Sequence, residues 1–510
     1  MSNMSSLSIA VSGLRAAQSG LSVTGHNMSN SDVKGYTRQT SVQETFIYKN
    51  LGLGGTGLLQ TGLGADISSI RQLRNRFFDA EYRTTSGTAG YYAAKYTTGQ
   101  EVENILGELE SSYAAQEVLG DVWEALNELT IYPEGIETRG TFIETCSTFL
   151  NKMKDISSGL FEYQLNLNEQ VKTYVNKIND IVKNIDTLND KITEYEADGK
   201  TKANDYRDQR NLLVDELSTY LKIDVKEVDN RVDILSEGKE LLVNGARSNL
   251  GLRYTTAKYP FVEPVFSDGK DIMAVGDKAI SLFGDLSEQN LTSGSDRCSG
   301  ALKGIMVSRG NIIADSTMDY DDISMYTIPS VKWQFDNLTR NIAELLNDSF
   351  SSGDTFDLKG GTGVEIFTKI DKNLGYTIDN IEINPELLKS DGYNKLALSA
   401  SGDIGDTTAI LEVIGKWDEG IEGLNNMSVN NYYRGIIDDI AIDVDEAGLY
   451  YDEHTEMAQN VESKRAAYSG VSLDEELSNM LKYQYAYQAA AKVINVVDSL
   501  IDKVVNGMAV

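Results

Sequence analysis

The chain has 510 residues, of which 41% are hydrophobic, so it can form several domains that each bury an apolar core. Its 77 acidic and 46 basic side chains give a formal net charge of −31. A chain this acidic is poorly suited to bind nucleic acid or an anionic membrane.

Both ends of the chain carry the pattern of a long amphipathic helix, over residues 7–28 and 473–505. Apolar residues recur there every three or four positions, a spacing that gathers them on one face. A terminal helix cannot bury such a face alone, so we expect it to pack on the other terminus, on neighbouring subunits, or on both. The predicted assembly interface consists of Leu7, Val11, Leu14, Leu21, Tyr483, Ala490, Val493, Val497, Leu500, Ile501 and Val504.

Five further segments have helical periodicity and predict a bundle of long helices. They cover residues 93–129, 137–197, 205–221, 333–350 and 432–468. Pro133 and Gly135 follow the first segment and end it.

The middle of the chain is expected to be rich in β-structure. Residues 223–228, 232–235 and 241–243 are short alternating runs, and turns at Asp229-Asn230 and Gly238 separate them, as in β-hairpins. A second β-rich stretch is expected over 355–400, followed by residues 407–414.

The predicted fold class is therefore α+β and multidomain, with long coiled-coil-like terminal helices, a helical bundle built from both chain ends, and an inserted β-rich outer part. We assign residues 1–34 and 472–510 to a terminal helical inner-core domain. The bundle is assigned 35–222, 330–352 and 416–471. The β-rich outer part is assigned 223–329 and 353–415.

Residue types that many enzymes and metal sites depend on are scarce. The chain has two histidines, His26 and His454, and two distant cysteines, Cys146 and Cys298, without Cys-x-x-Cys spacing. Carboxylates are abundant because the protein is acidic, so no catalytic pair stands out. We expect no catalytic residue, no metal ligand and no cofactor, and we interpret Cys146 as a helix packing residue.

Two short motifs have both a functional and a structural interpretation. Residues 52–57 match the Gly-x-Gly-x-x-Gly pattern of dinucleotide-binding turns, but the sequence lacks the strand before and the helix after it, so a flexible or hairpin loop is favoured. Residues 443–448 resemble the start of a calcium loop, but Ala447 and His454 stand where ligands are needed. We interpret that stretch as a helix surface.

Sequence blocks toward both ends of the chain carry a recognisable signature. The first block contains Asn27, Asn30, Val33, Gly35 and Tyr36, which resemble the signature of the bacterial flagellar rod, hook and hook-associated axial proteins. The Gly-Tyr-Thr-Arg-Gln run over 35–39 is similar to the hook-associated members that join hook and filament. Agreement extends to 205–213, 338–347 and 469–476, of which the last is the most diagnostic. We interpret residues 27–39 as the bend between terminal helix and bundle rather than as a binding site.

The resemblance implies a structural subunit of the hook–filament junction, with terminal helices in the inner wall of a tube and the β-rich part facing outward. It also implies an extracellular location, reached through the flagellar type III apparatus without a cleaved signal peptide. Implied partners are further copies in a ring at the hook tip, the hook protein, a second junction protein, and an export chaperone on the C-terminal helix; nucleic acid and membrane are not expected. Two alternatives stay open: a hook or distal rod subunit, and an adhesin or enzyme carried in the β-rich part.

Overall fold

The computed structural model describes residues 2–45, 48–54, 57–62, 64–107, 114–199, 201–267, 279–284, 286, 291, 294–351, 353–389 and 391–507. They form two compact units. The first contains Met1–Ser86, Lys177–Asn249 and His454–Val510, and the second contains Gly87–Asn176 and Leu250–Glu453. Each unit combines segments that lie far apart in the sequence. The predicted α+β, multidomain class is confirmed.

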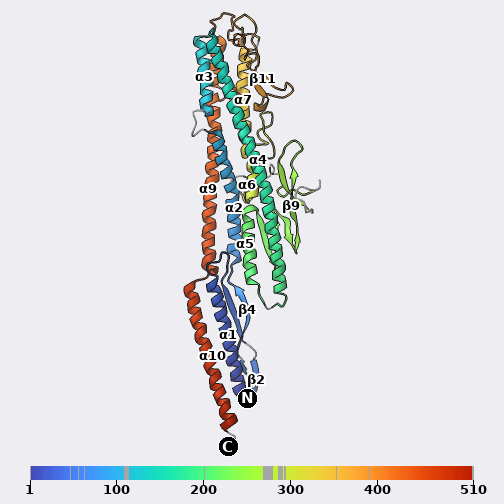
Figure 1. The fold of residues 1–510 in the computed structure, drawn as a ribbon, viewed down its shortest axis with the longest axis vertical. Coiled ribbons are helices and arrows are strands. Elements are labelled where there is room, and N and C mark those ends of the chain that lie inside the picture. Colours follow the sequence, from blue (N-terminus) through green and yellow to red (C-terminus); the bar gives the residue numbers. More distant parts are fainter. Residues whose placement is uncertain are drawn as a thin grey trace. The chain divides into compact units, whose positions relative to one another are not determined.

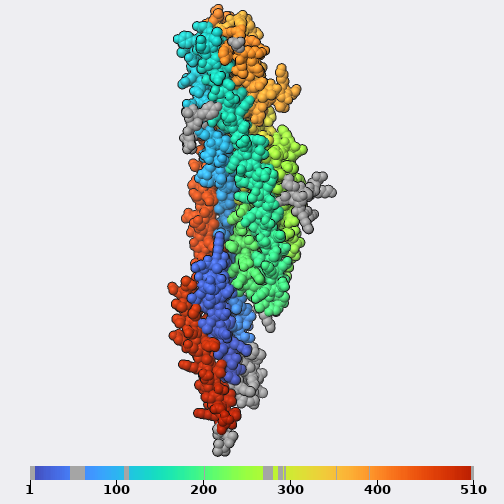
Figure 2. Space-filling model, in the orientation of Figure 1, coloured from blue at the N-terminus to red at the C-terminus, as the bar shows by residue number. Residues whose placement is uncertain are grey.

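The two ends of the chain meet in the first unit. Helix α1 (Ser2–Ser29) packs along helix α10 (Leu473–Gly507), and the two helices lie side by side, in blue and red (Figures 1 and 2). Asp474, Glu475 and Glu476 occupy the first turn of α10, where carboxylates interact favourably with the helix dipole. Both terminal helices occur where the apolar periodicity predicts them.

Two antiparallel strand pairs follow α1. Strand β1 (Gln39–Thr45) pairs with β4 (Ala65–Gln72), and β2 (Tyr48–Gly54) pairs with β3 (Gly57–Gly62). Gly52, Gly54 and Gly57 lie in the paired β2 and β3 strands, which confirms the hairpin interpretation of this motif. Gly55 and Thr56 lie outside the described residues. Strands β1 and β4 are not predicted from the sequence, because their mixed polar sequences lack a clear alternation of apolar and polar residues.

Helix α5 (Asn204–Tyr220) and a four-stranded antiparallel sheet complete the first unit. The strands are β5 (Ile223–Val228), β6 (Arg231–Ser236), β7 (Lys239–Val243) and β8 (Ala246–Arg247), in sequential order. Asp229 and Asn230 both have positive φ, of 47° and 70°, as a two-residue hairpin turn requires, so the predicted β5–β6 hairpin is confirmed.

The second unit is a helical bundle with small sheets. Its helices are α3 (Ala115–Ile131), α6 (Ala301–Arg309), α7 (Thr327–Phe350) and α8 (Thr408–Glu419), together with parts of α2 (Arg76–Leu106), α4 (Ile136–Tyr195) and α9 (Val429–Ser469). Strand β9 (Asn249–Tyr254) pairs with β10 (Val262–Ser267), and β11 (Phe367–Lys369) pairs with β12 (Ile381–Ile383). Short 3₁₀ turns lie at Ile378–Asn380, Gly392–Lys395 and Glu422–Leu424.

Asparagine side chains on the long helices bind the backbone of the strands in both units. In the first unit, Asn189 of α4 donates to the carbonyl of Val232 at 3.1 Å and accepts its N–H at 3.0 Å. In the second, Asn347 of α7 donates to the carbonyl of Phe367 at 2.8 Å and accepts its N–H at 3.0 Å. Each side-chain amide binds the backbone N–H and carbonyl on the side of the strand that is not hydrogen-bonded to a paired strand at that residue. It therefore fixes the strand on its helix.

Several predicted elements differ in detail from those observed. The 93–129 helix is two helices, and α2 begins already at Arg76. Helix α6 was not predicted, and the described part of 355–400 contains two strands of only three residues each. Residues 408–419 form α8. These segments mix small and polar residues with apolar ones, so helix and strand periodicities are hard to distinguish in them. Among the described residues, no helix is long and apolar enough to cross a membrane.

Candidate assembly site

Close contact between α1 and α10 depends on a glycine. A Cβ atom built on Gly20 of α1 would lie 2.6 Å from the ring of Tyr483 of α10. Small buried residues continue on the same face of α1, which contains Ala10, Ala17, Thr24 and Asn27. The absence of bulk on this face lets the aromatic ring lie against the α1 backbone.

Helix α10 carries two sets of apolar side chains. The less exposed set includes Tyr483, Ala490, Ile494, Val497 and Ile501, and Val497 is only 6% exposed. We call the exposed set the outer row of α10, and each of its side chains is between 46% and 67% exposed. The outer row consists of Leu473, Leu477, Leu481, Tyr485, Val493, Val496, Leu500 and Val504.

The structure divides the residues of the predicted interface between these two sets. Tyr483, Ala490, Val497 and Ile501 belong to the less exposed set, whereas Val493, Leu500 and Val504 belong to the outer row. On α1, Leu7, Val11, Leu14 and Leu21 are half-buried.

A single helix partner covers only a narrow stripe, so the broad apolar surface of α10 cannot all face α1. Five outer-row residues are absent from the predicted interface: Leu473, Leu477, Leu481, Tyr485 and Val496. Their signal is the four-residue spacing from Leu473 to Tyr485, which does not coincide with the stripe through Val497. That these residues join subunits stays a prediction.

The chain leaves α1 through a hydrogen-bonded bend. The buried side chain of Asn27 donates to the carbonyl of Gln39 at 2.9 Å and accepts the N–H of Gln39 at 3.0 Å. The Tyr36 hydroxyl donates to the same Asn27 oxygen at 2.8 Å. Because its proton is used there, the Tyr36 oxygen accepts the hydrogen bond from Nδ1 of His26 at 3.0 Å. Burial and the nearby Asp205 and Asp208 raise the pKa of Tyr36, so its hydroxyl keeps the proton that it donates. The bend predicted over 27–39 is confirmed.

Helix α5 receives this bend through Asp208. Its carboxylate accepts the N–H of Thr37 at 3.0 Å and the side-chain N–H of Gln72 at 2.7 Å. Burial raises the pKa of Asp208 to about 6, although the hydrogen bonds from Thr37 act in the opposite direction. Gly35 has a φ of +81°, which favours glycine, and a Cβ atom at this position would lie 3.5 Å from the side chain of Leu212 of α5.

The start of α10 is tied to the same bend by Arg38. Its Nε donates to the buried Glu476 at 2.7 Å, and its Nη2 donates to the exposed Glu475 at 2.8 Å. The N–H of Arg38 donates to the carbonyl of Ser469, at the end of α9, at 2.8 Å.

Three separate sequence blocks, 27–39, 205–213 and 469–476, therefore meet in one cluster of polar contacts. We call it the junction cluster: Asn27, Gly35, Tyr36, Thr37, Arg38, Gln39, Gln72, Asp205, Asp208, Ser469, Glu475 and Glu476. It fixes the point where both terminal helices join the rest of the first unit.

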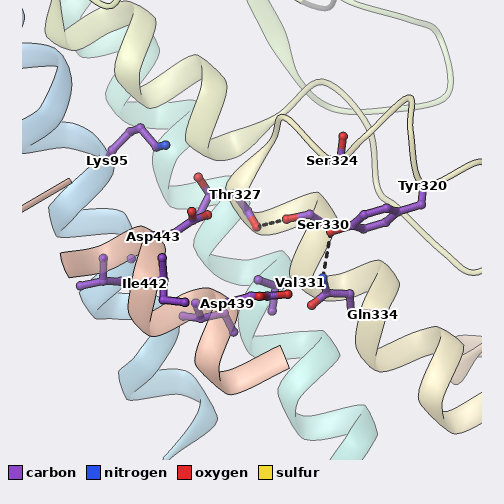
Figure 3. Close-up of a pocket in the computed structure, with 13 residues that line it drawn as sticks. Lys95, Tyr320, Ser324, Thr327, Ser330, Val331, Gln334, Asp439, Ile442 and Asp443 are labelled. Carbon is purple, nitrogen blue, oxygen red and sulfur yellow. Dashed lines mark hydrogen bonds between the residues drawn. The ribbon is translucent and has the colours of Figure 1, made fainter. Parts of the chain in front are cut away.

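One pocket lies among the helices of the second unit. In the second unit, a hollow of about 260 Å³ is lined by α2, α7, α9 and the loop before α7 (Figure 3). There Ser330 donates to the carbonyl of Thr327 at 3.0 Å, and Gln334 donates to the hydroxyl of Tyr320 at 2.9 Å. The lining residues include no imidazole or thiol to activate a nucleophile. In the described part of the chain, no three or more His, Cys, Asp or Glu residues are grouped to hold a metal ion.

The remaining motif interpretations agree with the structure. Cys146 is buried in α4, and burial raises the pKa of its thiol, so it is a helix packing residue as predicted. Residues 443–448 lie inside α9, which confirms a helical rather than a calcium-loop conformation.

The two terminal helices pair with each other, and the bend that joins them to the rest of the first unit carries the signature of axial proteins. These features agree with one class, the axial structural proteins of the bacterial flagellum. Consistent with this, residues 462–507 match the model described as flagellar basal body rod FlgEFG protein C-terminal. Residues 99–367, more than half of the chain, match the flagellar hook-associated protein FlgK helical domain. The chain belongs to the FlgK family of flagellar hook-associated proteins. It is thus a structural protein of the flagellum, of the hook-associated type.

Full-length relatives have the same assignment. The chain is 28% identical to flagellar hook-associated protein 1 of Bacillus subtilis, over 98% of this chain and 97% of that protein. It is 24% identical to flagellar hook-associated protein 1 of Escherichia coli, over 98% of each chain. A solved structure, the flagellar hook junction protein FlgK from Burkholderia pseudomallei, aligns with 57% of this chain and 46% of its own, at 17% identity and a TM-score of 0.45.

Proposed function

We propose that this protein joins the flagellar hook to the filament, and that the outer row of α10 is the surface through which it assembles. The observation that carries the proposal is that α10 uses one apolar set against α1 and leaves eight other large apolar side chains about half exposed. Large exposed apolar surfaces of this kind mark sites of protein–protein interaction.

Burial of the outer row would contribute favourable free energy to assembly. The side chains are already about half covered, and complete burial of such a side chain contributes roughly 1.5–3 kcal/mol. Eight of them would contribute on the order of 6–12 kcal/mol gross, before the cost of association. If the outer row of one copy meets a different surface of the next copy, the contact is heterologous. Heterologous contacts build rings or helical tubes.

The same surface determines the proposed partners. Further copies in a ring at the hook tip, the hook protein and a second junction protein would cover the outer row in the assembled flagellum. Before assembly, an export chaperone would cover it, because a free apolar row promotes aggregation. In this proposal residues 1–34 and 472–510 form the inner core of the tube, and the chain leaves the cell through the flagellar type III apparatus.

Charge placed in the outer row tests the proposal. We expect Leu481→Asp together with Leu500→Asp to leave the free chain folded but to abolish its incorporation at hook tips, because the new carboxylates cannot be buried between subunits. The matched control carries the same charges at exposed polar positions of α10, Gln484→Asp with Ser499→Asp, and should incorporate normally. Filament formation in cells that lack the wild-type protein is the readout. Normal filaments with the Leu481/Leu500 variant would refute the proposal.

A further inference from the structure

A second unpartnered helix face lies on α9, in the second unit. Ile442 and Leu449 are 63% and 72% exposed, and Leu449 is the most exposed large apolar side chain in the described part of the chain. Asp438, Asp445 and Asp452, also exposed, alternate with them at spacings of four and three residues. We call this alternating set the acidic seam: Asp438, Ile442, Asp445, Leu449 and Asp452.

The negative charge on this part of α9 is denser than the average of the chain. Residues 429–453 contain seven acidic side chains and one basic side chain, Arg434, a net charge of −6. A stretch of that length with the average charge density of this chain would carry about −1.5. Like charges one turn apart, such as Asp439 and Asp443, destabilise a helix, so intrinsic helix stability does not account for the pattern.

The seven carboxylates also lack ion-pair partners in the described part of the chain. Within the described residues none of them makes an ion pair or a hydrogen bond, whereas carboxylates in other parts of the molecule, such as Asp215, Glu227 and Glu263, pair with arginines. Asp439 and Asp443 border the 260 Å³ hollow, in which Lys95 is the one basic side chain among the described lining residues (Figure 3). Burial raises the pKa of Asp443 although Lys95 acts to lower it, so that cation offsets the cost of burying the carboxylate only in part.

We infer that the acidic seam is a docking surface for a basic amphipathic helix of another polypeptide. Spacings of four and three residues match the seam of a helix that packs along α9, with apolar contacts at Ile442 and Leu449. Lysine or arginine side chains at the intervening positions of the docked helix pair with Asp438, Asp445 and Asp452. A further basic side chain of that helix can extend over Val331 and Val444 toward Asp439 and Asp443. A second copy using the same face is disfavoured, because its aspartates would meet these aspartates.

The experiment uses the full-length chain and a fluorescent peptide of about three heptads, with leucine and lysine at the two seam positions. We expect saturable one-to-one binding, and no binding of the same peptide with glutamate in place of lysine. Asp438→Asn with Asp445→Asn and Asp452→Asn should weaken binding at least about tenfold, and Ile442→Ser with Leu449→Ser should weaken it similarly.

The matched control removes three exposed carboxylates from α3, by Asp121→Asn, Glu124→Gln and Glu128→Gln, and should bind as the wild type does. Equal weakening by the α3 control would show attraction to net charge alone and overturn the inference. So would unchanged binding by the Ile442/Leu449 variant, or cross-links through α9 between copies of this chain in place of peptide binding.

Discussion

At the scale of single residues, the junction cluster contains two carboxylates that differ mainly in burial. Glu476 and Glu475 both bind Arg38, but the side chain of Glu476 is 2% exposed and that of Glu475 is 57% exposed. Solvent screens the exposed pair, whereas the buried pair holds the first turn of α10 against the bend.

We predict that Glu476→Gln lowers the free energy of opening of α10 by about 1.5–3 kcal/mol, because a buried hydrogen bond to a charged group is weakened. Glu475→Gln should change it by no more than about 0.5 kcal/mol. Hydrogen exchange of the amides in the first turns of α10 measures both. Equal protection in the two variants would contradict this account of the cluster.

Asp208 makes the stability of the cluster dependent on pH. Its pKa in the folded chain is about 6, above its ordinary value of 3.8, so the folded state binds the proton more tightly than the unfolded state. Its contribution is therefore fully present below pH 3.8 and is lost as the pH rises through about 6.

Comparison with Asp208→Asn isolates this effect, because other titrating groups cancel in the difference. We predict that the stability of the wild type relative to this variant increases when the pH is lowered from about 7 to about 4, as measured by urea unfolding at each pH. A constant difference, or one that decreases toward the lower pH, would show that Asp208 does not titrate in this way.

At the scale of elements, the pairing of α1 with α10 depends on close helix approach. Gly20→Ala would place a methyl group 2.6 Å from the ring of Tyr483, so either the ring or the helices must shift. We expect a loss of about 1–3 kcal/mol in the pairing, measured as reduced hydrogen-exchange protection of α10.

Gly25→Ala is the matched control, because nothing lies within 4 Å of the position that its methyl group would take and alanine favours the helix. It should leave α10 protected or slightly better protected. Equal loss of protection in both variants would mean that the contact at Gly20 does not determine the pairing.

The elements also differ in how far the sequence predicts them. Helices α4, α5 and α10 and the β5–β6 hairpin follow strong apolar periodicity or paired turn residues, and they appear close to their predicted bounds. Strands β1 and β4 were missed because their polar sequences are stabilised by α1 and by each other, contacts that local periodicity does not contain. The sequence alone does not separate the two apolar sets of α10, because spacings of three and four residues are compatible with either face of the helix.

The junction cluster also shows what local sequence patterns cannot predict. Its sequence blocks could be recognised by resemblance, but the cluster joins Thr37 to Asp208, 171 positions away, and Arg38 to Glu476, 438 positions away. No local pattern states that these residues will bind each other. Only the tertiary fold brings the partners together.

At the scale of the whole molecule, each surface has a different task. The less exposed apolar set of α10 holds the chain's own termini together, the junction cluster anchors that pair, and in the proposed assembly the outer row contacts neighbouring subunits. The net charge of −31 opposes aggregation of the free chain through this exposed row. Assembly should therefore change the environment of the outer row while leaving the α1–α10 contact as it is.

Thiol reactivity at two α10 positions measures this change most directly. Leu500→Cys lies in the outer row and Val497→Cys in the contact with α1, and the native Cys146 and Cys298 are both buried. We predict that the thiol at position 500 reacts quickly in the free chain and becomes protected in assembled flagella, whereas the thiol at position 497 is protected in both. A thiol at position 500 that reacts equally fast before and after assembly would contradict the proposal that the outer row joins the subunits.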